Sequence, residues 1–167
     1  MSTSTPRIAV CPGTYDPPTH GHLDIIRRAA GLFDKVIVGV VRSPKHKQPL
    51  LPDSDRVELL QDALSDVPNV EVQVFSSLVV EFARACGAVA MVKGLRAISD
   101  FEWEFQMAHL NKGQAPEIET VFLTTSPRYS FVSSSGVREL AAFGGDVSNY
   151  VTPRVEQRLR EALAGHA

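Results

Sequence analysis

The sequence predicts a doubly wound α/β fold, in which helices cover both faces of a five-stranded parallel sheet. Five short apolar runs alternate with longer amphipathic segments, which is the order that such a fold requires. The run at residues 36–41 is apolar throughout, as expected of a strand covered on both faces. The 167 residues show no repeat or linker, and 44% are hydrophobic. We therefore expect a single domain over residues 1–167, with residues 1–6 flexible.

The strands are predicted from apolar content and from the turn residues that bound each run. The third run alternates polar and apolar residues, so we expect it near an edge of the sheet, with one face less covered. The predicted strands are residues 8–11, 36–41, 70–75, 88–92 and 120–124.

Six helices are expected between and after these strands, each with an apolar stripe at helical spacing. Asp53 is the capping candidate of the second helix, Ser99 has capping-box spacing in the fourth, and Thr152 precedes a proline at the start of the last. Phe101 and Phe105 are expected on the inner stripe of the fourth helix. The helices are expected to start near residues 23, 53, 78, 99, 137 and 153.

The polar segments of the chain follow the predicted strands. The carboxyl ends of parallel strands share one edge of a sheet, so loops that follow them can converge on one cleft. The four segments that we expect to meet there are residues 12–22, 42–49, 93–96 and 127–136.

The first segment carries the densest chemistry. Its three prolines and two glycines favour an unusual backbone path that brings Thr14, Thr19, His20 and His22 to the start of a helix. A helix start favours phosphate, and a histidine there can donate a charged hydrogen bond to it. The run Ser133-Ser134-Ser135 offers one helix cap plus spare hydroxyls and amides at a second helix start. A structural turn with a capping Thr or His is the alternative for the first segment.

Composition excludes several classes of protein. The net charge of −2 gives no basic field for nucleic acid or an anionic membrane, so phosphate binding must be local. No apolar run reaches the roughly 18 residues that a membrane-spanning helix needs, and residues 1–6 lack a signal-peptide core. The two cysteines, Cys11 and Cys86, are expected to pack rather than to form a bridge. These features predict a cytoplasmic protein.

Four motifs together resemble a known family. Gly13-Thr14-Tyr15-Asp16-Pro17 followed by Thr19-x-Gly21-His22 is similar to the signature of the nucleotidyltransferase superfamily. With Lys93-Gly94-Leu95-Arg96, Asp100-Phe101-Glu102-Trp103-Glu104 and the stretch at residues 129–135, the pattern resembles bacterial phosphopantetheine adenylyltransferases from Arg7 to about Leu163. The resemblance implies a Rossmann-like fold, a magnesium requirement and a homohexamer. It also implies transfer of the adenylyl group of ATP to 4′-phosphopantetheine, which gives dephospho-coenzyme A and pyrophosphate in coenzyme A biosynthesis.

The resemblance also implies the site residues. His22 would stabilise the α-phosphate, Thr14 would orient the attacking phosphate, and Lys47 would clamp the phosphates of both substrates. Implied contacts to ATP are Thr14, Tyr15 (through its backbone), His22, Gly94, Leu95, Arg96, Glu104, Tyr129, Ser130, Phe131, Val132, Ser133, Ser134 and Ser135. Implied contacts to phosphopantetheine are Thr14, Lys47, Val79, Lys93 and Asn111. Asp16 and Asp100 are not a convincing metal site, so Mg²⁺ would be held mainly by ATP phosphates and water.

One motif departs from the family. Relatives have a Ser/Asn-Pro-x-Lys segment, but here Ser43-Pro44 precedes Lys45-His46-Lys47, with one extra residue. An ungapped match places His46 at the lysine position, whereas alignment to the downstream Pro49 favours Lys47 over Lys45 as the clamp.

Two other functions stay open at this stage. One is an adenylyltransferase for another small phosphorylated acceptor, such as nicotinate mononucleotide. The other is a catalytically silent regulator that binds a nucleotide or coenzyme A.

Overall fold

The computed structural model describes residues 5–42, 48–96 and 98–165, and it confirms the predicted fold class. Five strands form one sheet in the order β3-β2-β1-β4-β5, and every neighbouring pair is parallel. Because β3 and β5 lie at the edges, the expectation that the alternating third strand lies near an edge is correct. The strands are β1 (Ile8–Gly13), β2 (Lys35–Val41), β3 (Val70–Phe75), β4 (Ala90–Leu95) and β5 (Glu119–Thr124).

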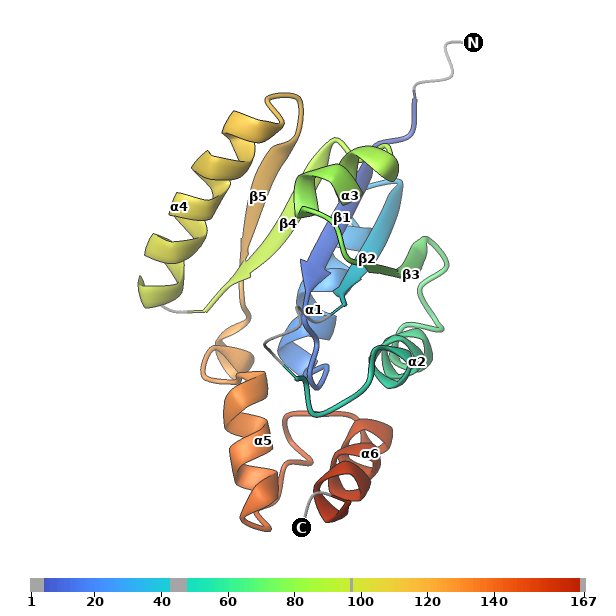
Figure 1. Ribbon diagram of the computed structural model, residues 1–167, viewed down its shortest axis with the longest axis vertical. Coiled ribbons are helices and arrows are strands. Elements are labelled where there is room, and N and C mark those ends of the chain that lie inside the picture. The colour runs from blue at the N-terminus through green and yellow to red at the C-terminus, as the bar shows by residue number, and fades with distance from the viewer. Residues whose placement is uncertain (1–4, 43–47, 97, 166–167) are drawn as a thin grey trace.

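Helices connect the strands and extend the fold beyond the sheet (Figure 1). Helices α5 and α6 lie past the carboxyl ends of the strands, at the bottom of the view in Figure 1. The helices are α1 (His20–Ala30), α2 (Asp53–Ala63), α3 (Val79–Ala85), α4 (Ile98–Gln114), α5 (Ser134–Ala142) and α6 (Pro153–Ala164), with a short 3₁₀ turn η1 (Pro127–Tyr129).

Alternate residues of the central strands enter two separate cores. Cys11 and Val38 pack in one core with the apolar faces of α1 and α2, whereas Val10 and Ile37 pack in the other with α3. This division follows from the period of two in a strand, which points successive side chains to opposite faces. The continuous apolar run in β2 is thus explained by burial on both faces of the sheet.

A third apolar cluster closes the end of the molecule that carries the loops. Leu51 and Leu59 pack there with Val137 of α5 and with Val155 and Leu159 of α6. Thr152 caps α6 by accepting a hydrogen bond from the backbone N–H of Val155, as predicted. This cluster fixes α5, which carries the serine run, against the start of α2.

Several helix starts differ from the sequence prediction. Helix α1 begins at His20, three residues earlier than expected, because Thr19 caps it. Helix α5 begins at Ser134 for the same reason, with Ser133 as its cap. Asp53 is not a cap: it is the first residue of α2, and its carboxylate instead binds the side chains of Arg42 and Arg56. Helix α4 begins at Ile98, before Ser99.

The expected inner stripe of α4 is not buried within the chain. Phe101 packs edge-on against Phe122 of β5, yet Phe101 and Phe105 are 44% and 48% exposed. Trp103 and Leu110, elsewhere on the helix, are more exposed still. The amphipathic pattern identified a helix, but it did not reveal that α4 covers an edge strand and keeps apolar side chains on its surface.

Candidate functional site

The four loops that were expected to converge do line one cleft at the carboxyl ends of the strands. The cleft has a volume of about 560 Å³. Its walls come from the loop after β1, from Val41, Gln48 and Pro49 around the end of β2, from the end of β4, and from residues 132–135 before and within α5. The prediction drawn from strand topology is therefore confirmed.

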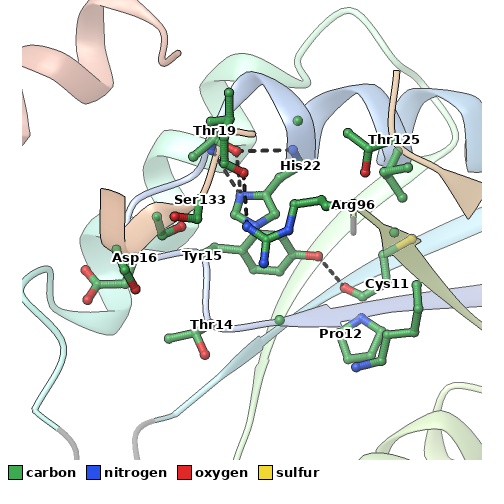
Figure 2. Close-up of a pocket in the computed structure, with 18 of the residues that line it drawn as sticks. Cys11, Pro12, Thr14, Tyr15, Asp16, Thr19, His22, Arg96, Thr125 and Ser133 are labelled. Atoms are coloured by element: carbon green, nitrogen blue, oxygen red, sulfur yellow. Dashed lines mark hydrogen bonds between the residues drawn. The ribbon is translucent and has the colours of Figure 1, made fainter. Parts of the chain in front are cut away.

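The loop after β1 takes a path that the sequence did not reveal. Its positive φ angle, 54°, belongs to Tyr15 and not to a glycine. The Tyr15 ring folds back so that its hydroxyl donates to the carbonyl oxygen of Cys11 at 2.8 Å (Figure 2). A Cβ atom on Gly13 would lie 2.9 Å from that ring. Gly13 is thus needed for close approach, since the ring occupies the space that a side chain would fill.

His22 is held at the start of α1 by a reciprocal cap. The hydroxyl of Thr19 accepts a hydrogen bond from the backbone N–H of His22, and Nδ1 of His22 accepts one from the backbone N–H of Thr19 at 3.1 Å (Figure 2). A ring nitrogen that accepts a hydrogen bond carries no proton, so the neutral ring has its proton on Nε2. The hydrogen bonds that cap α1 therefore also fix the orientation of His22, the candidate catalytic residue.

His22 is neutral at physiological pH. Burial against the Tyr15 ring, 5.0 Å away between centroids, and secondarily the charge of Arg96 lower the pKa of His22 to about 4. The sequence-based expectation of a charged hydrogen bond concerns the protein with phosphate bound, and it stays a prediction. In the ligand-free protein His22 offers a neutral Nε2–H donor to the cleft.

Two cations at the end of β4 are paired with carboxylates of α4. Nζ of Lys93 lies 3.5 Å from Oε2 of Glu104, and Nε of Arg96 lies 3.0 Å from Oδ2 of Asp100. Arg96 also donates to the carbonyl oxygen of Val132, which joins the β4 loop to the segment before α5. These contacts hold both cations at the cleft wall.

The serine run begins α5 beside the loop after β1. The hydroxyl of Ser133 caps the helix by accepting from the N–H of Gly136, and the hydroxyl of Ser134 donates to the carbonyl oxygen of Pro17. The hydroxyl of Ser135 accepts a hydrogen bond from Nη2 of Arg138 at 3.4 Å, so all three hydroxyls have structural partners. Helix geometry leaves the backbone N–H groups of Ser134 and Ser135 without a carbonyl partner inside the helix, so these N–H groups are the anion donors that remain.

Of the eighteen predicted site residues, eleven line the cleft, six do not, and one lies outside the described residues. Those that line it are Thr14, Tyr15, His22, Lys93, Gly94, Arg96, Glu104, Val132, Ser133, Ser134 and Ser135. Six others are not in the cleft lining. Leu95 is the last residue of β4, Val79 begins α3, and Asn111 lies on α4. Tyr129, Ser130 and Phe131 belong to η1 and the turn after it. Lys47 and its rival Lys45 lie outside the described residues. The roles of all eighteen stay predictions.

Sequence reasoning missed two arginines. Arg138 of α5 lines the cleft and donates to the backbone carbonyl of Asp16. It lies one turn after Ser135, a spacing that places both side chains on one helix face and would have identified it. Arg56 of α2, to which the sequence-based predictions gave no role, is completely buried. Its position four residues before the buried Leu60 was the available signal.

The described part of the chain gives two further results on binding. It holds no group of three or more His, Cys, Asp or Glu side chains arranged to coordinate a metal ion. Within the same residues, no helix combines the length and the hydropathy needed to cross a lipid bilayer. Both cysteines are free, and burial raises the pKa of the Cys11 thiol to about 12.

Comparison with known proteins identifies clear relatives. The model of the cytidylyltransferase-like family matches residues 10–140. A phosphopantetheine adenylyltransferase from Caldanaerobacter subterraneus is 52% identical, over 93% of this chain and 96% of the relative. Phosphopantetheine adenylyltransferases from Methylobacillus flagellatus and Heliobacterium modesticaldum are each 54% identical, over 93% and 92% of this chain and 96% and 91% of theirs.

Solved structures support the fold at low sequence identity. A candidate nicotinate-nucleotide adenylyltransferase from Vibrio parahaemolyticus superposes with a TM-score of 0.72 at 19% identity, over 98% of both chains. A lipopolysaccharide core biosynthesis protein from Thermoplasma volcanium superposes with a TM-score of 0.56 at 14% identity, over 73% of this chain and 99% of the other.

Proposed function

The chain belongs to the phosphopantetheine adenylyltransferases of the cytidylyltransferase-like family, and on that premise we propose that it adenylylates 4′-phosphopantetheine by direct in-line attack. An oxygen of the 4′-phosphate forms a bond to the α-phosphorus of ATP. The bond from that phosphorus to the bridging oxygen breaks, and its electron pair leaves with pyrophosphate. The products are dephospho-coenzyme A and pyrophosphate, in coenzyme A biosynthesis.

One observation carries the proposal: three kinds of phosphate-binding group face a single cleft. They are the Nε2–H of a neutral histidine, the cations after β4, and the N-terminus of α5. A phosphate nucleophile is already anionic, so it needs neither a protein nucleophile nor a strong base. Catalysis then rests on alignment of the two substrates and on stabilisation of charge at the transferring phosphorus.

The proposed roles follow the walls of the cleft. Thr14 orients the attacking phosphate, and His22 donates to an α-phosphate oxygen as charge moves onto it. Arg96 and the amides of Ser134 and Ser135 bind the β- and γ-phosphates that leave. The remaining proposed contacts to ATP are Tyr15, Gly94, Leu95, Glu104, Tyr129, Ser130, Phe131, Val132 and Ser133. Those proposed for phosphopantetheine are Val79, Lys93 and Asn111, with Lys47 as the clamp between the substrates.

Magnesium is proposed to enter with ATP. The carboxylate of Asp16 lines the cleft, but its two oxygens already accept hydrogen bonds from the N–H groups of Leu50 and Leu51. The carboxylate of Asp100 is paired with Arg96. This donor set suits a cation held by phosphate oxygens and water rather than by protein carboxylates. When bound, Mg²⁺ would neutralise charge on the polyphosphate.

We also propose a cytoplasmic homohexamer. The exposed apolar residues of α4, among them Phe101, Trp103, Phe105 and Leu110, support this proposal, because exposed apolar residues of this kind gather at protein interfaces. Sedimentation of the purified protein measures the number of subunits directly.

The test of function is pyrophosphate release from ATP and Mg²⁺, with 4′-phosphopantetheine or nicotinate mononucleotide as acceptor. We expect release only with phosphopantetheine, with dephospho-coenzyme A as the second product. Release with nicotinate mononucleotide alone would overturn the substrate and support the alternative adenylyltransferase.

The His22→Asn variant separates catalysis from binding. Asparagine keeps an acceptor for the N–H of Thr19 but has no Nε2 donor. We expect turnover to fall by about 100-fold or more with the fold retained, in line with the loss of one preorganised donor. Absence of turnover in folded wild-type protein that still binds ATP or coenzyme A would support the silent regulator instead.

A further inference from the structure

We propose that Arg56 is a positioning residue for the adenylyl transfer, because its guanidinium fastens together the two strand ends that form one wall of the cleft. The inference rests on the proposed function, since it assigns a role in that reaction. Arg56 lies in α2 and is not itself part of the cleft lining.

The guanidinium of Arg56 is fully buried and bound on every side. Its Nη1 donates to the carbonyl oxygen of Thr14 at 2.6 Å and to that of Val41 at 3.0 Å. Nε donates to the carbonyl oxygen of Leu51 at 3.1 Å, and Nη2 to Oδ1 of Asp53 at 2.8 Å. Three of the four acceptors are thus backbone carbonyls that come from three different segments of chain.

These segments are the ones on which the proposed chemistry depends. Thr14 follows β1 and is proposed to orient the attacking phosphate, while Val41 is the last residue of β2. Val41 and Leu51 also lie on either side, in the sequence, of Lys45 and Lys47. A shared donor at the carbonyls of Thr14 and Val41 fixes the separation of the two strand ends at the cleft.

A second buried charge strengthens the same junction. The carboxylate of Asp16 accepts hydrogen bonds from the N–H groups of Leu50 and Leu51 at 2.9 Å each, while Arg56 binds the carbonyl oxygen of the same Leu51. Among the described residues, Asp16 and Arg56 are the buried charged side chains, and both bind the backbone of Leu51. Burial of charge is costly unless it is fully paired, and here it is concentrated at the cleft.

The geometry requires the planar fork of arginine. Donors on three nitrogens of one rigid plane meet four acceptors, an arrangement that the single ammonium of lysine cannot reproduce. Arg56→Lys keeps a positive charge and most of the side-chain volume but loses part of this set. The strand ends are then free to shift, and a misplacement of about 1 Å can cost about 100-fold in rate.

The test compares Arg56→Lys with wild type and with Leu60→Ala, all as full-length protein. Leu60 is buried in the same helix and packs in an apolar core, so its truncation destabilises α2 but leaves every hydrogen-bonding group of Arg56 in place. We expect kcat of Arg56→Lys to fall about 10- to 100-fold. Its KM for ATP should stay within about threefold of wild type, because Arg56 contacts only Thr14 among the proposed ATP-binding residues, and those at the end of β4 and in α5 are unaffected. Leu60→Ala, assayed at a temperature where it is folded, should keep the kcat of wild type.

Several outcomes would overturn the inference. One is an unchanged kcat in Arg56→Lys, and another is an equal loss of kcat in Leu60→Ala at matched loss of stability. If Arg56→Lys fails to fold, the second variant is Asp53→Asn, which removes the carboxylate that orients Nη2 of Arg56. We expect Asp53→Asn to lower kcat and to leave KM for ATP unchanged. A kcat equal to that of wild type would refute the role of Arg56. Wild-type turnover with phosphopantetheine tests the proposed function separately, so a loss confined to the variants concerns Arg56 alone.

Discussion

Protonation of His22 should destabilise the folded protein, and the His22→Asn variant isolates this effect. The ring is partly buried at the cleft wall, and its Nδ1 is occupied as an acceptor from the N–H of Thr19. Burial first, and the charge of Arg96 second, lower its pKa from 6.5 to about 4. In the unfolded chain the histidine regains its ordinary pKa, so the unfolded state takes up a proton first as the pH falls.

The size of the effect follows from the two pKa values. Stability from the neutral ring is complete above pH 6.5 and is lost progressively as the pH falls toward 4. The fall in pKa from 6.5 to about 4 corresponds to about 3 kcal/mol, of which about 2 kcal/mol is lost between roughly pH 7.5 and pH 5. Asparagine at this position accepts the same hydrogen bond but does not titrate, so the variant lacks this pH-dependent loss of stability.

Urea unfolding of both proteins at about pH 7.5 and pH 5 measures this pH-dependent loss of stability directly. Other titrating groups are common to the two proteins and cancel when the pH effect in the variant is subtracted from that in wild type. We expect wild type to lose about 2 kcal/mol more than His22→Asn on acidification. An equal loss in both proteins would refute the assignment of a neutral His22.

Three further predictions each concern a substitution at a single position. Gly39→Ala should destabilise the protein by about 1–3 kcal/mol in urea unfolding, because its Cβ would lie 2.5 Å from Phe82 and 3.0 Å from Phe75; unchanged stability would contradict the packing of this site. Tyr15→Phe removes the hydroxyl bound to Cys11, which should cost about 1 kcal/mol, while kcat stays near wild type if Tyr15 acts through its backbone. Lys47→Ala should lower turnover far more than Lys45→Ala, and the reverse ranking would reject the proposed clamp.

The fold was predictable because hydrophobic runs alone define the strands. Residues 36–41 revealed a strand buried on both faces, and the alternation at residues 70–75 indicated an edge strand. Convergence of the four loops then followed from the parallel topology and did not require knowledge of any side chain. The start of α1 was misplaced because a cap is set by which side chain reaches which N–H group, and Thr19 was one of several candidates.

What the sequence did not reveal are properties that depend on neighbours distant in the sequence. The neutral state of His22 comes from burial and from Arg96, which lies 74 positions away, and no local pattern reports either. Arg56 looks like a surface charge until the carbonyls of Thr14 and Val41 are brought to it by the sheet. Phe101 was expected to be buried because the sequence pattern does not say how much of an edge strand a helix covers.

The pairing of Lys93 with Glu104 and of Arg96 with Asp100 has a consequence for how the cleft responds to ionic strength. Each of these two cations is already paired with a carboxylate. When a polyphosphate binds, each cation therefore exchanges one anionic partner for another. Added salt weakens the ion pairs with the carboxylates, which are lost on binding, as well as the ion pairs with the polyphosphate, which form. Affinity for the polyphosphate should therefore decline less steeply with salt concentration than the number of cations in the cleft would suggest.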